Sequence, residues 1–229
     1  MIGGYVVDEI ISITRTAIKE YYTLHVPVTE QYYANGFLNH NSGKTFLLIR
    51  NIIFRALKAP NTRHVIFRFR FNAIKASVIL DTFPKVLQIA YPGVRYDLNK
   101  TDFFATFDNK SQIWFAGLDD KERTEKVLGQ EFSTIYFNEA SQIPIGSIDM
   151  ALTRLAQKSS QMVDIVNKHN VVISRYSADL QPRCYYDLNP PSKSHWSYKR
   201  FVKKIDPYSN KALNNPDDYV SFRINPQDN

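Results

Sequence analysis

Apolar and polar positions follow two different patterns along the chain, and the change falls near residue 42. Before it, short runs of β-branched and aromatic residues lie at 10–14, 21–27 and 32–38, separated by polar turns. Runs of this length and composition are typical of short β-strands. We therefore expect a small all-β segment over residues 1–41.

From residue 42 onward, apolar stretches with helical spacing alternate with short apolar runs, which predicts an α/β domain over residues 42–229. The first helix is apolar on most faces, so we expect it to be buried. The stretch 159–181 is less regular, which favours an inserted loop. Helices are expected at 45–57, 73–89, 124–128, 145–157 and 194–203, and strands at 64–69, 103–107, 112–115, 132–137, 183–188 and 219–224.

Composition excludes several classes of protein. A hydrophobic content of 44% supports a buried core, and no apolar run approaches the roughly 20 residues of a membrane helix. The N-terminus is acidic and does not have the pattern of a secretion signal. Cys184 is the only cysteine, which excludes internal disulfides and fits a reducing compartment. We expect a cytoplasmic protein with no membrane partner.

Charge is distributed unevenly between the two parts. Residues 1–41 carry a net charge of −2 and residues 42–229 carry +9, which together give the total of +7. An excess of basic charge favours a polyanionic partner, and nucleic acid in particular. A basic solvated face without a partner is the alternative.

Half of a phosphate-binding loop stands at the junction, in Ser42, Gly43, Lys44 and Thr45. The full loop is G-x-x-x-x-G-K-[ST], but its first glycine position is Leu38, and no apolar strand precedes it. The sequence thus predicts an ASCE (RecA-like) P-loop NTPase core that lacks its first strand and the beginning of its P-loop. In such a core the lysine contacts the β- and γ-phosphates of ATP, and the threonine hydroxyl ligates Mg²⁺.

A second nucleotide motif follows the expected strand at 132–137. Asn138 and Glu139 come directly after that strand, at the edge where open α/β sheets bind their ligands. Asn138 occupies the metal-binding aspartate position of a Walker B motif, so metal contact there is through the amide or through water. Glu139 is the candidate base for the attacking water. The alternative is that these polar residues cap the next helix.

The residues around position 41 also fit peptide-bond cleavage. The side-chain amide of Asn41 can attack its own backbone carbonyl, which closes a succinimide and breaks the bond to Ser42. His40 titrates in the range needed to assist the leaving amine. The Ser42 hydroxyl can accept an acyl group and pass it to its own freed amine. For the tripeptide alone, a polar loop before a helix is the alternative.

Residues 5–41 resemble the last two conserved blocks of the intein (Hint) family, with Asn35-Gly36 followed by the terminal His40-Asn41. Thr23 and Glu30 depart from the usual Asp and His. No N-terminal intein half precedes them, and Met1 has the character of a translated start, so the resemblance implies a C-terminal split-intein fragment. It implies trans-splicing, without a cofactor, with a separate chain that carries the N-terminal intein half and the front of the host protein.

Residues 42–229 resemble the large terminase subunit, the ATP-driven motor that packages tailed-phage DNA. The resemblance implies that Asn189 is a coupling residue that senses the γ-phosphate, and that an arginine stabilises the transition state; the sequence does not rank the candidates. It further implies double-stranded DNA, a small terminase subunit, a portal and a homo-oligomeric ring as partners, in the cytoplasm of an infected bacterium. A nuclease half has no counterpart here. The motifs are Ser42–Thr45, Gly129–Phe132, Asn138–Ala140, Ala151–Leu155, Asn189–Pro191 and His195-Trp196, and the arginines are Arg68, Arg70 and Arg154.

The function expected from the sequence is therefore a precursor that splices in trans and then hydrolyses ATP to drive viral DNA packaging. Two alternatives remain open. One is a P-loop protein with a degenerate loop that never splices, and the other is an inactive fragment that binds DNA through its basic surface.

Overall fold

The computed structural model describes residues 31–34, 37–40, 43–119, 121–167, 169, 171–189 and 191–222. The chain divides into two compact units, residues 1–44 with 221–229 and residues 45–220. The predicted cleavage residues Asn41 and Ser42 lie outside the described residues, as do the expected strands at 10–14 and 21–27.

The described part of the first unit contains a β-hairpin. Strand β1 (Gln31–Ala34) pairs antiparallel with β2 (Phe37–His40) in a two-stranded sheet, and Ala34 stands opposite Phe37. A two-residue connection between strands in this register is typical of a tight hairpin. The structure therefore confirms β-structure at Gln31–Ala34 and Phe37–His40, and it pairs these two strands in a sheet of their own.

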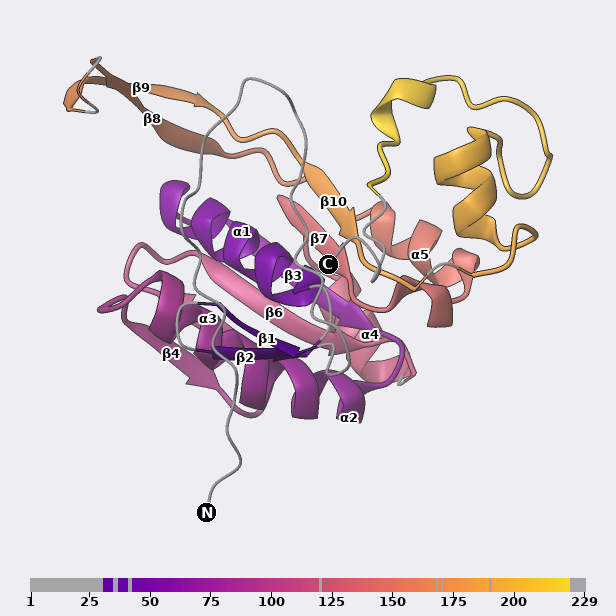
Figure 1. The fold of residues 1–229 in the computed structure, drawn as a ribbon, viewed down its shortest axis with the longest axis horizontal. Helices are drawn as coiled ribbons and strands as arrows, with labels where there is room; N and C mark the ends of the chain where they lie inside the picture. Colours follow the sequence, from indigo (N-terminus) through magenta and orange to yellow (C-terminus); the bar gives the residue numbers. More distant parts are fainter. Residues whose placement is uncertain are drawn as a thin grey trace. The chain divides into compact units, whose positions relative to one another are not determined.

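The second unit is built on a six-stranded mixed sheet in the order β10-β7-β3-β6-β5-β4 (Figure 1). The first four strands of this order are parallel, and β5 and β4 add antiparallel. The strands are β3 (Arg63–Arg68), β4 (Tyr96–Asn99), β5 (Phe104–Phe107), β6 (Gln112–Gly117), β7 (Thr134–Phe137) and β10 (Arg183–Tyr186).

Helices cover both faces of this sheet. The face that includes Ile66 and Tyr136 packs against α1 and the run α2–η1–α3, whereas the face with Val65 and Phe137 packs against α4 and α5. Alternation along each strand produces the two faces, because successive side chains point to opposite sides. The helices are α1 (Lys44–Lys58), α2 (Phe71–Ile74), the π-helical η1 (Lys75–Thr82), α3 (Phe83–Ala90), α4 (Lys121–Leu128) and α5 (Ile145–Leu152).

A buried polar network joins α1 to the neighbouring strands β3 and β7. The Arg55 guanidinium donates to the Thr134 hydroxyl at 2.9 Å and to the Gln181 carbonyl at 2.6 Å. The Thr134 hydroxyl also lies 2.7 Å from Nδ1 of His64, whose Nε2 is 2.9 Å from the Thr62 hydroxyl. Because His64 is fully buried with both ring nitrogens bonded, it holds β3 to β7 and is a core residue.

Several expectations were wrong in detail. The first helix is amphipathic, not buried on most faces, since Leu47 is 55% exposed. Strand β4 was missed, and α5 ends at Leu152, five residues before the predicted end. Tyr219–Phe222 contain no strand, because the backbone there runs without ladder bonds. The helix expected at 194–203 begins two residues later, at Trp196, and continues as the π-helical η3 (Tyr198–Lys203).

The stretch expected to be an irregular loop is a long β-hairpin. Strands β8 (Ser160–Val166) and β9 (Val172–Asp179) pair antiparallel in a separate sheet, which projects beyond the six-stranded sheet (Figure 1). Its strands are largely exposed and mix polar with apolar residues on both faces, so the period of two was obscured in the sequence. No helix in the described part of the chain is long and apolar enough to cross a membrane.

Candidate functional site

The ends of two parallel strands and the start of one helix meet at the carboxyl edge of the sheet. Strand β10 pairs with β7 in a register that sets Tyr186 beside Phe137. The next residues, Asp187 and Asn138, therefore leave the sheet side by side. Thr45, in the first turn of α1, contacts both of them. This edge is where open parallel sheets bind their ligands.

Asp187 is the centre of this cluster. It is buried, and its carboxylate accepts hydrogen bonds from the Thr45 hydroxyl at 3.0 Å and from the Glu139 backbone N–H at 2.7 Å. The Asn138 amide nitrogen lies 3.1 and 3.2 Å from its two oxygens. Asp187 thus fixes the positions of the helix start and of the turn after β7.

The contacts of Asn138 determine the orientation of its side-chain amide. Its Nδ2 faces the Asp187 carboxylate and the Tyr136 hydroxyl, which is 3.1 Å away. The reverse orientation would set the amide oxygen against the carboxylate, so the nitrogen must point this way. The amide oxygen, Oδ1, is buried and has no hydrogen-bond partner among the described residues. It is an unused acceptor at the sheet edge.

The side chain of Tyr136 remains neutral beside this carboxylate. Burial, together with the negative charge of Asp187, raises the pKa of the Tyr136 phenol well above its ordinary value. The phenol therefore serves as a hydrogen-bonding group in the cluster and does not titrate in the physiological range.

Glu139 follows Asn138 in a left-handed backbone conformation, with φ of 52° and ψ of 50°. This region is uncommon for a residue with a side chain and is often found at functional sites. Two contacts to Asp187 hold the turn: the Glu139 N–H bond, and the Ala140 N–H bond to the Asp187 carbonyl at 2.8 Å. The Glu139 carboxylate is consequently turned out of the sheet.

An arginine from the neighbouring strand binds the Glu139 carboxylate. Arg68, the last residue of β3, places Nη2 2.5 Å from Glu139 Oε2, and its Nη1 donates to the Ser77 hydroxyl at 2.7 Å. Gln142 donates to the same glutamate oxygen at 2.8 Å. The side chain of Glu139 remains 40% exposed, so water reaches it. Of the three candidate arginines, only Arg68 enters the site; Arg70 and Arg154 are exposed elsewhere.

The other predicted site residues are placed as follows. Gly43 has a positive φ of 64° directly before α1, and Lys44 is the first residue of that helix. Asn189 is exposed, two residues beyond Asp187. His40 is the last residue of β2. Asn41 and Ser42 lie outside the described residues.

Sequence reasoning missed the role of Asp187. The predicted strand 183–188 ran past Asp187, whereas the observed strand β10 ends at Tyr186, so Asp187 directly follows its strand just as Asn138 does. Parallel neighbouring strands bring such positions together. The strand order, which sets β10 next to β7, could not be predicted from the sequence.

The chemistry of these donors fits a divalent cation that is shared with a phosphate ligand. The hydroxyl of Thr45, the carboxylate of Asp187 and the unused oxygen of Asn138 are all oxygen ligands, which Mg²⁺ prefers. Within the described part of the chain, no three His, Cys, Asp or Glu side chains gather to hold a metal by themselves. Mg²⁺ commonly binds through one or two protein oxygens, with water and phosphate completing its shell.

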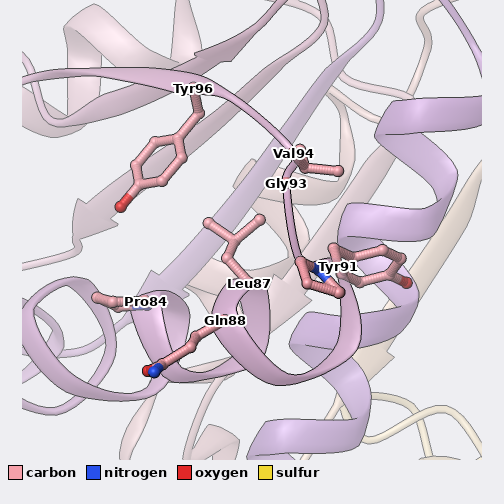
Figure 2. A pocket seen from close by; sticks show the side chains of 8 residues that line it. Pro84, Leu87, Gln88, Tyr91, Gly93, Val94 and Tyr96 are labelled. Carbon is pink, nitrogen blue, oxygen red and sulfur yellow. The ribbon is translucent and has the colours of Figure 1, made fainter.

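A separate pocket of about 390 Å³ lies beside α3 and the start of β4 (Figure 2). Its lining carries no charged side chain and shares no residue with the Asp187 cluster, so it has none of the groups needed for phosphate chemistry. The lining residues are Pro84, Leu87, Gln88, Tyr91, Pro92, Gly93, Val94 and Tyr96.

Comparison with known protein families identifies the chain. The family model for the phage terminase large subunit matches residues 37–229. The chain belongs to the phage terminase large-subunit family. The match begins at Phe37, so it includes the last five residues of the predicted intein fragment. Among curated proteins, no sequence matches this terminase.

Solved structures share the fold of this terminase. The large terminase of a thermophilic bacteriophage has a TM-score of 0.55 and 17% identity, over 80% of this chain and 40% of the phage protein. The same phage terminase in complex with ADP has a TM-score of 0.53, with the same identity and coverage. The likeness confirms the mixed α/β fold with a parallel sheet, and the chain spans two fifths of the thermophilic phage protein.

Proposed function

We propose that this terminase domain hydrolyses ATP to drive the packaging of viral DNA. The observation that carries the proposal is the position of Glu139, which follows Asn138, donates its backbone N–H to Asp187 beside Thr45, and has a water-accessible carboxylate held by Arg68. The family membership and the ADP complex of the thermophilic phage terminase support a nucleotide as the ligand.

Each residue has a role in this proposal. Gly43 and the start of α1 bind phosphate through backbone N–H groups, and Lys44 neutralises the β- and γ-phosphate oxygens. Mg²⁺, when bound with ATP, supplies positive charge that stabilises the transferring phosphoryl group. Thr45 and Asn138 hold that ion or its water.

Glu139 orients the attacking water and accepts its proton. In the structure Arg68 holds this carboxylate, and a shift of Arg68 onto the phosphate would release Glu139 and stabilise the transition state. Asn189, on the loop after β10, couples the state of the γ-phosphate to the rest of the motor.

The test is a pair of matched glutamate variants. Glu139→Gln removes the base and keeps the shape, so ATP hydrolysis should fall by about 10²–10⁴-fold while nucleotide binding persists. Glu131→Gln changes an exposed glutamate before β7 and should leave both quantities unchanged. Hydrolysis that is equal in the two variants would contradict the assignment of Glu139.

The partners follow from the proposed motor and from charge. The excess of basic residues after residue 41 favours double-stranded DNA as the substrate that is moved. A small terminase subunit, a portal and further copies of this chain in a ring complete the proposed machine, in the cytoplasm of an infected bacterium.

We also propose that the chain is a splicing precursor, and two observations favour this second function. The segment before the P-loop motif pairs in the β1–β2 hairpin and not in the six-stranded sheet. Among the described residues, no strand pairs with the outer edge of β10, the edge strand that Asp187 directly follows. A front segment from a separate chain, ligated to Ser42, would supply the missing strand and the beginning of the P-loop.

In the proposed splicing, the partner chain supplies the acyl group, and this chain supplies His40, Asn41 and Ser42. The amide nitrogen of Asn41 attacks its own carbonyl carbon, the bond to Ser42 breaks, and His40 delivers a proton to the leaving amine. Beforehand, the Ser42 hydroxyl attacks the ester that joins the partner's host segment to the first Cys or Ser of the N-terminal intein half. That ester bond breaks, the Cys or Ser side chain leaves with the proton of the Ser42 hydroxyl, and the acyl group now on Ser42 moves to the freed amine.

Mass spectrometry of this chain co-expressed with the chain that carries the N-terminal intein half tests the proposal. We expect a ligated product together with a free peptide Met1–Asn41 that ends in a succinimide. Asn41→Ala should abolish release of the peptide, and Asn39→Ala, two residues upstream, should permit it. An intact Asn41–Ser42 bond in the wild-type pair would refute splicing and leave the ATPase proposal standing.

A further inference from the structure

Asp187 is a buried carboxylate that forms no ion pair with a cationic side chain in the described part of the chain. It is 7% exposed, and none of the ion pairs between described residues includes it. Burial of a charged group without a counter-charge is costly, and hydrogen bonds from Thr45, Asn138 and Glu139 offset only part of that cost. The arrangement therefore favours an additional positive charge at the carboxylate.

The neighbouring amide has a matching property. The Asn138 amide nitrogen donates to Asp187, whereas the amide oxygen is buried and has no hydrogen-bond partner among the described residues. An unpaired buried acceptor is costly, and a metal-bound water or a metal ion removes that cost. The two residues together offer one negative charge and one neutral oxygen, beside the hydroxyl of Thr45.

We propose that Asp187 supplies the negative charge of a divalent-cation site at this edge of the sheet, in place of the residue at the end of β7. The proposal rests on the proposed ATPase function, since the cation is the Mg²⁺ that accompanies the nucleotide. The Walker B position on β7 cannot carry that charge, because it holds Asn138. The charge stands instead at Asp187, directly after the adjacent strand β10.

Electrostatics explains why the two positions do not both carry a carboxylate. The Asn138 nitrogen lies 3.1 Å from an Asp187 oxygen, so an aspartate at position 138 would place two negative charges at about the same separation. Like charges so close disfavour ionisation of both groups. Asn138 and Asp187 are thus a complementary pair, and exchanging them should preserve the charge and the number of donors and acceptors.

A purely structural role for Asp187 makes a different prediction. Its bond to the Glu139 N–H holds the turn after β7, so its loss would lower stability whether or not a cation binds there. Only the proposed cation site predicts that metal affinity depends on the charge at this pair and recovers when the charge returns on the other strand.

The experiment measures Mn²⁺ binding to the full chain by electron paramagnetic resonance, with and without ADP, and unfolding in urea for each variant. Asp187→Asn should weaken Mn²⁺ binding by about 10–100-fold. The exchange variant, Asn138→Asp with Asp187→Asn, should restore most of the affinity. Asp164→Asn, which removes an exposed carboxylate of the β8–β9 hairpin, is the control and should bind as the wild type does.

The outcomes separate the two proposals. Three results would overturn the cation site. Asp187→Asn could bind Mn²⁺ as tightly as the wild type, a folded exchange variant could fail to recover the affinity, or the wild type could bind no Mn²⁺ with or without ADP. If Asp187→Asn does not fold, the exchange variant and Asn138→Asp decide, because Asn138→Asp should bind Mn²⁺ more tightly than the wild type. Charge-dependent Mn²⁺ binding would sustain the cation site even if the ligated protein binds no ADP, and that second result would refute the ATPase.

Discussion

His64 should make the stability of the domain depend on pH. Its Nε2–H donates to the Thr62 hydroxyl, which itself donates to the Ala59 carbonyl at 2.7 Å. Its Nδ1 accepts from the Thr134 hydroxyl, whose oxygen already accepts from Arg55. The network is satisfied only by the neutral ring. Burial, and then the charge of Arg55, lower the pKa of His64 from 6.5 to about 3.

The magnitude follows from linkage between protonation and folding. Between pH 6.5 and about 3 the unfolded chain binds a proton that the folded chain excludes, so stability is complete above pH 6.5 and decreases as the pH falls. At pH 5 the loss is about 2 kcal/mol relative to pH 8, and the full shift corresponds to about 5 kcal/mol.

Urea denaturation at several pH values measures this slope. The matched variant is His64→Gln, whose amide can accept from Thr134 and donate to Thr62 but does not titrate. His169→Gln, in the exposed turn of the β8–β9 hairpin, controls for loss of a histidine. Carboxylates titrate in all three proteins, so the difference between them isolates His64.

We expect the wild type to lose about 2 kcal/mol more than His64→Gln between pH 8 and pH 5. His169→Gln should follow the wild type. If the difference in unfolding free energy between the wild type and His64→Gln stays constant over this range, the inference that the ring is buried and neutral is wrong.

Three further predictions concern the core, the thiol and the phosphate loop. Ile53→Ala, at a fully buried position of α1, should cost about 2–5 kcal/mol in urea unfolding, whereas Leu47→Ala, at a 55% exposed position of the same helix, should cost less than about 1 kcal/mol. Cys184 is only partly buried as a residue, but burial of its thiol raises the pKa of that thiol to about 12. Labelling of the thiol in the folded protein at pH 8 should therefore be about 10³-fold slower than labelling of a free cysteine. Equally fast labelling of the folded and the unfolded protein would contradict this prediction. Lys44→Ala should abolish ATP hydrolysis in the ligated protein, as measured by phosphate release, and activity that survives the change would remove the lysine from the site.

Much of the fold could be predicted from the sequence because its elements have strong local signals. The helix from Thr45, the strand ending at Phe137 and the hairpin turning at Asp108-Asn109 all appear close to their predicted bounds. The β8–β9 hairpin was not predicted, because its exposed strands have no clear alternation of apolar and polar residues. Short-range pattern detects an element through the face it buries, and this hairpin buries little.

The residues of the candidate site likewise include some that the sequence predicted and some that it did not. Thr45, Asn138 and Glu139 were predictable, since each stands in a motif whose spacing is local. Asp187 was not, because its importance depends on β10 lying beside β7, two strands that are far apart in the sequence. Arg68 could be proposed but not chosen from the sequence, and its ion pair with Glu139 distinguishes it from the exposed alternatives.

The sequence by itself therefore determined which chemical groups are present and which of them end a strand or begin a helix. Local preferences of a few residues decide those properties, through side-chain alternation, turn formation and the requirements of phosphate binding. The tertiary structure alone decided which of these ends meet. Strand order and register bring the Asp187 carboxylate within 3.2 Å of the Asn138 amide, and only at such distances do charge, burial and unpaired oxygens act on one another.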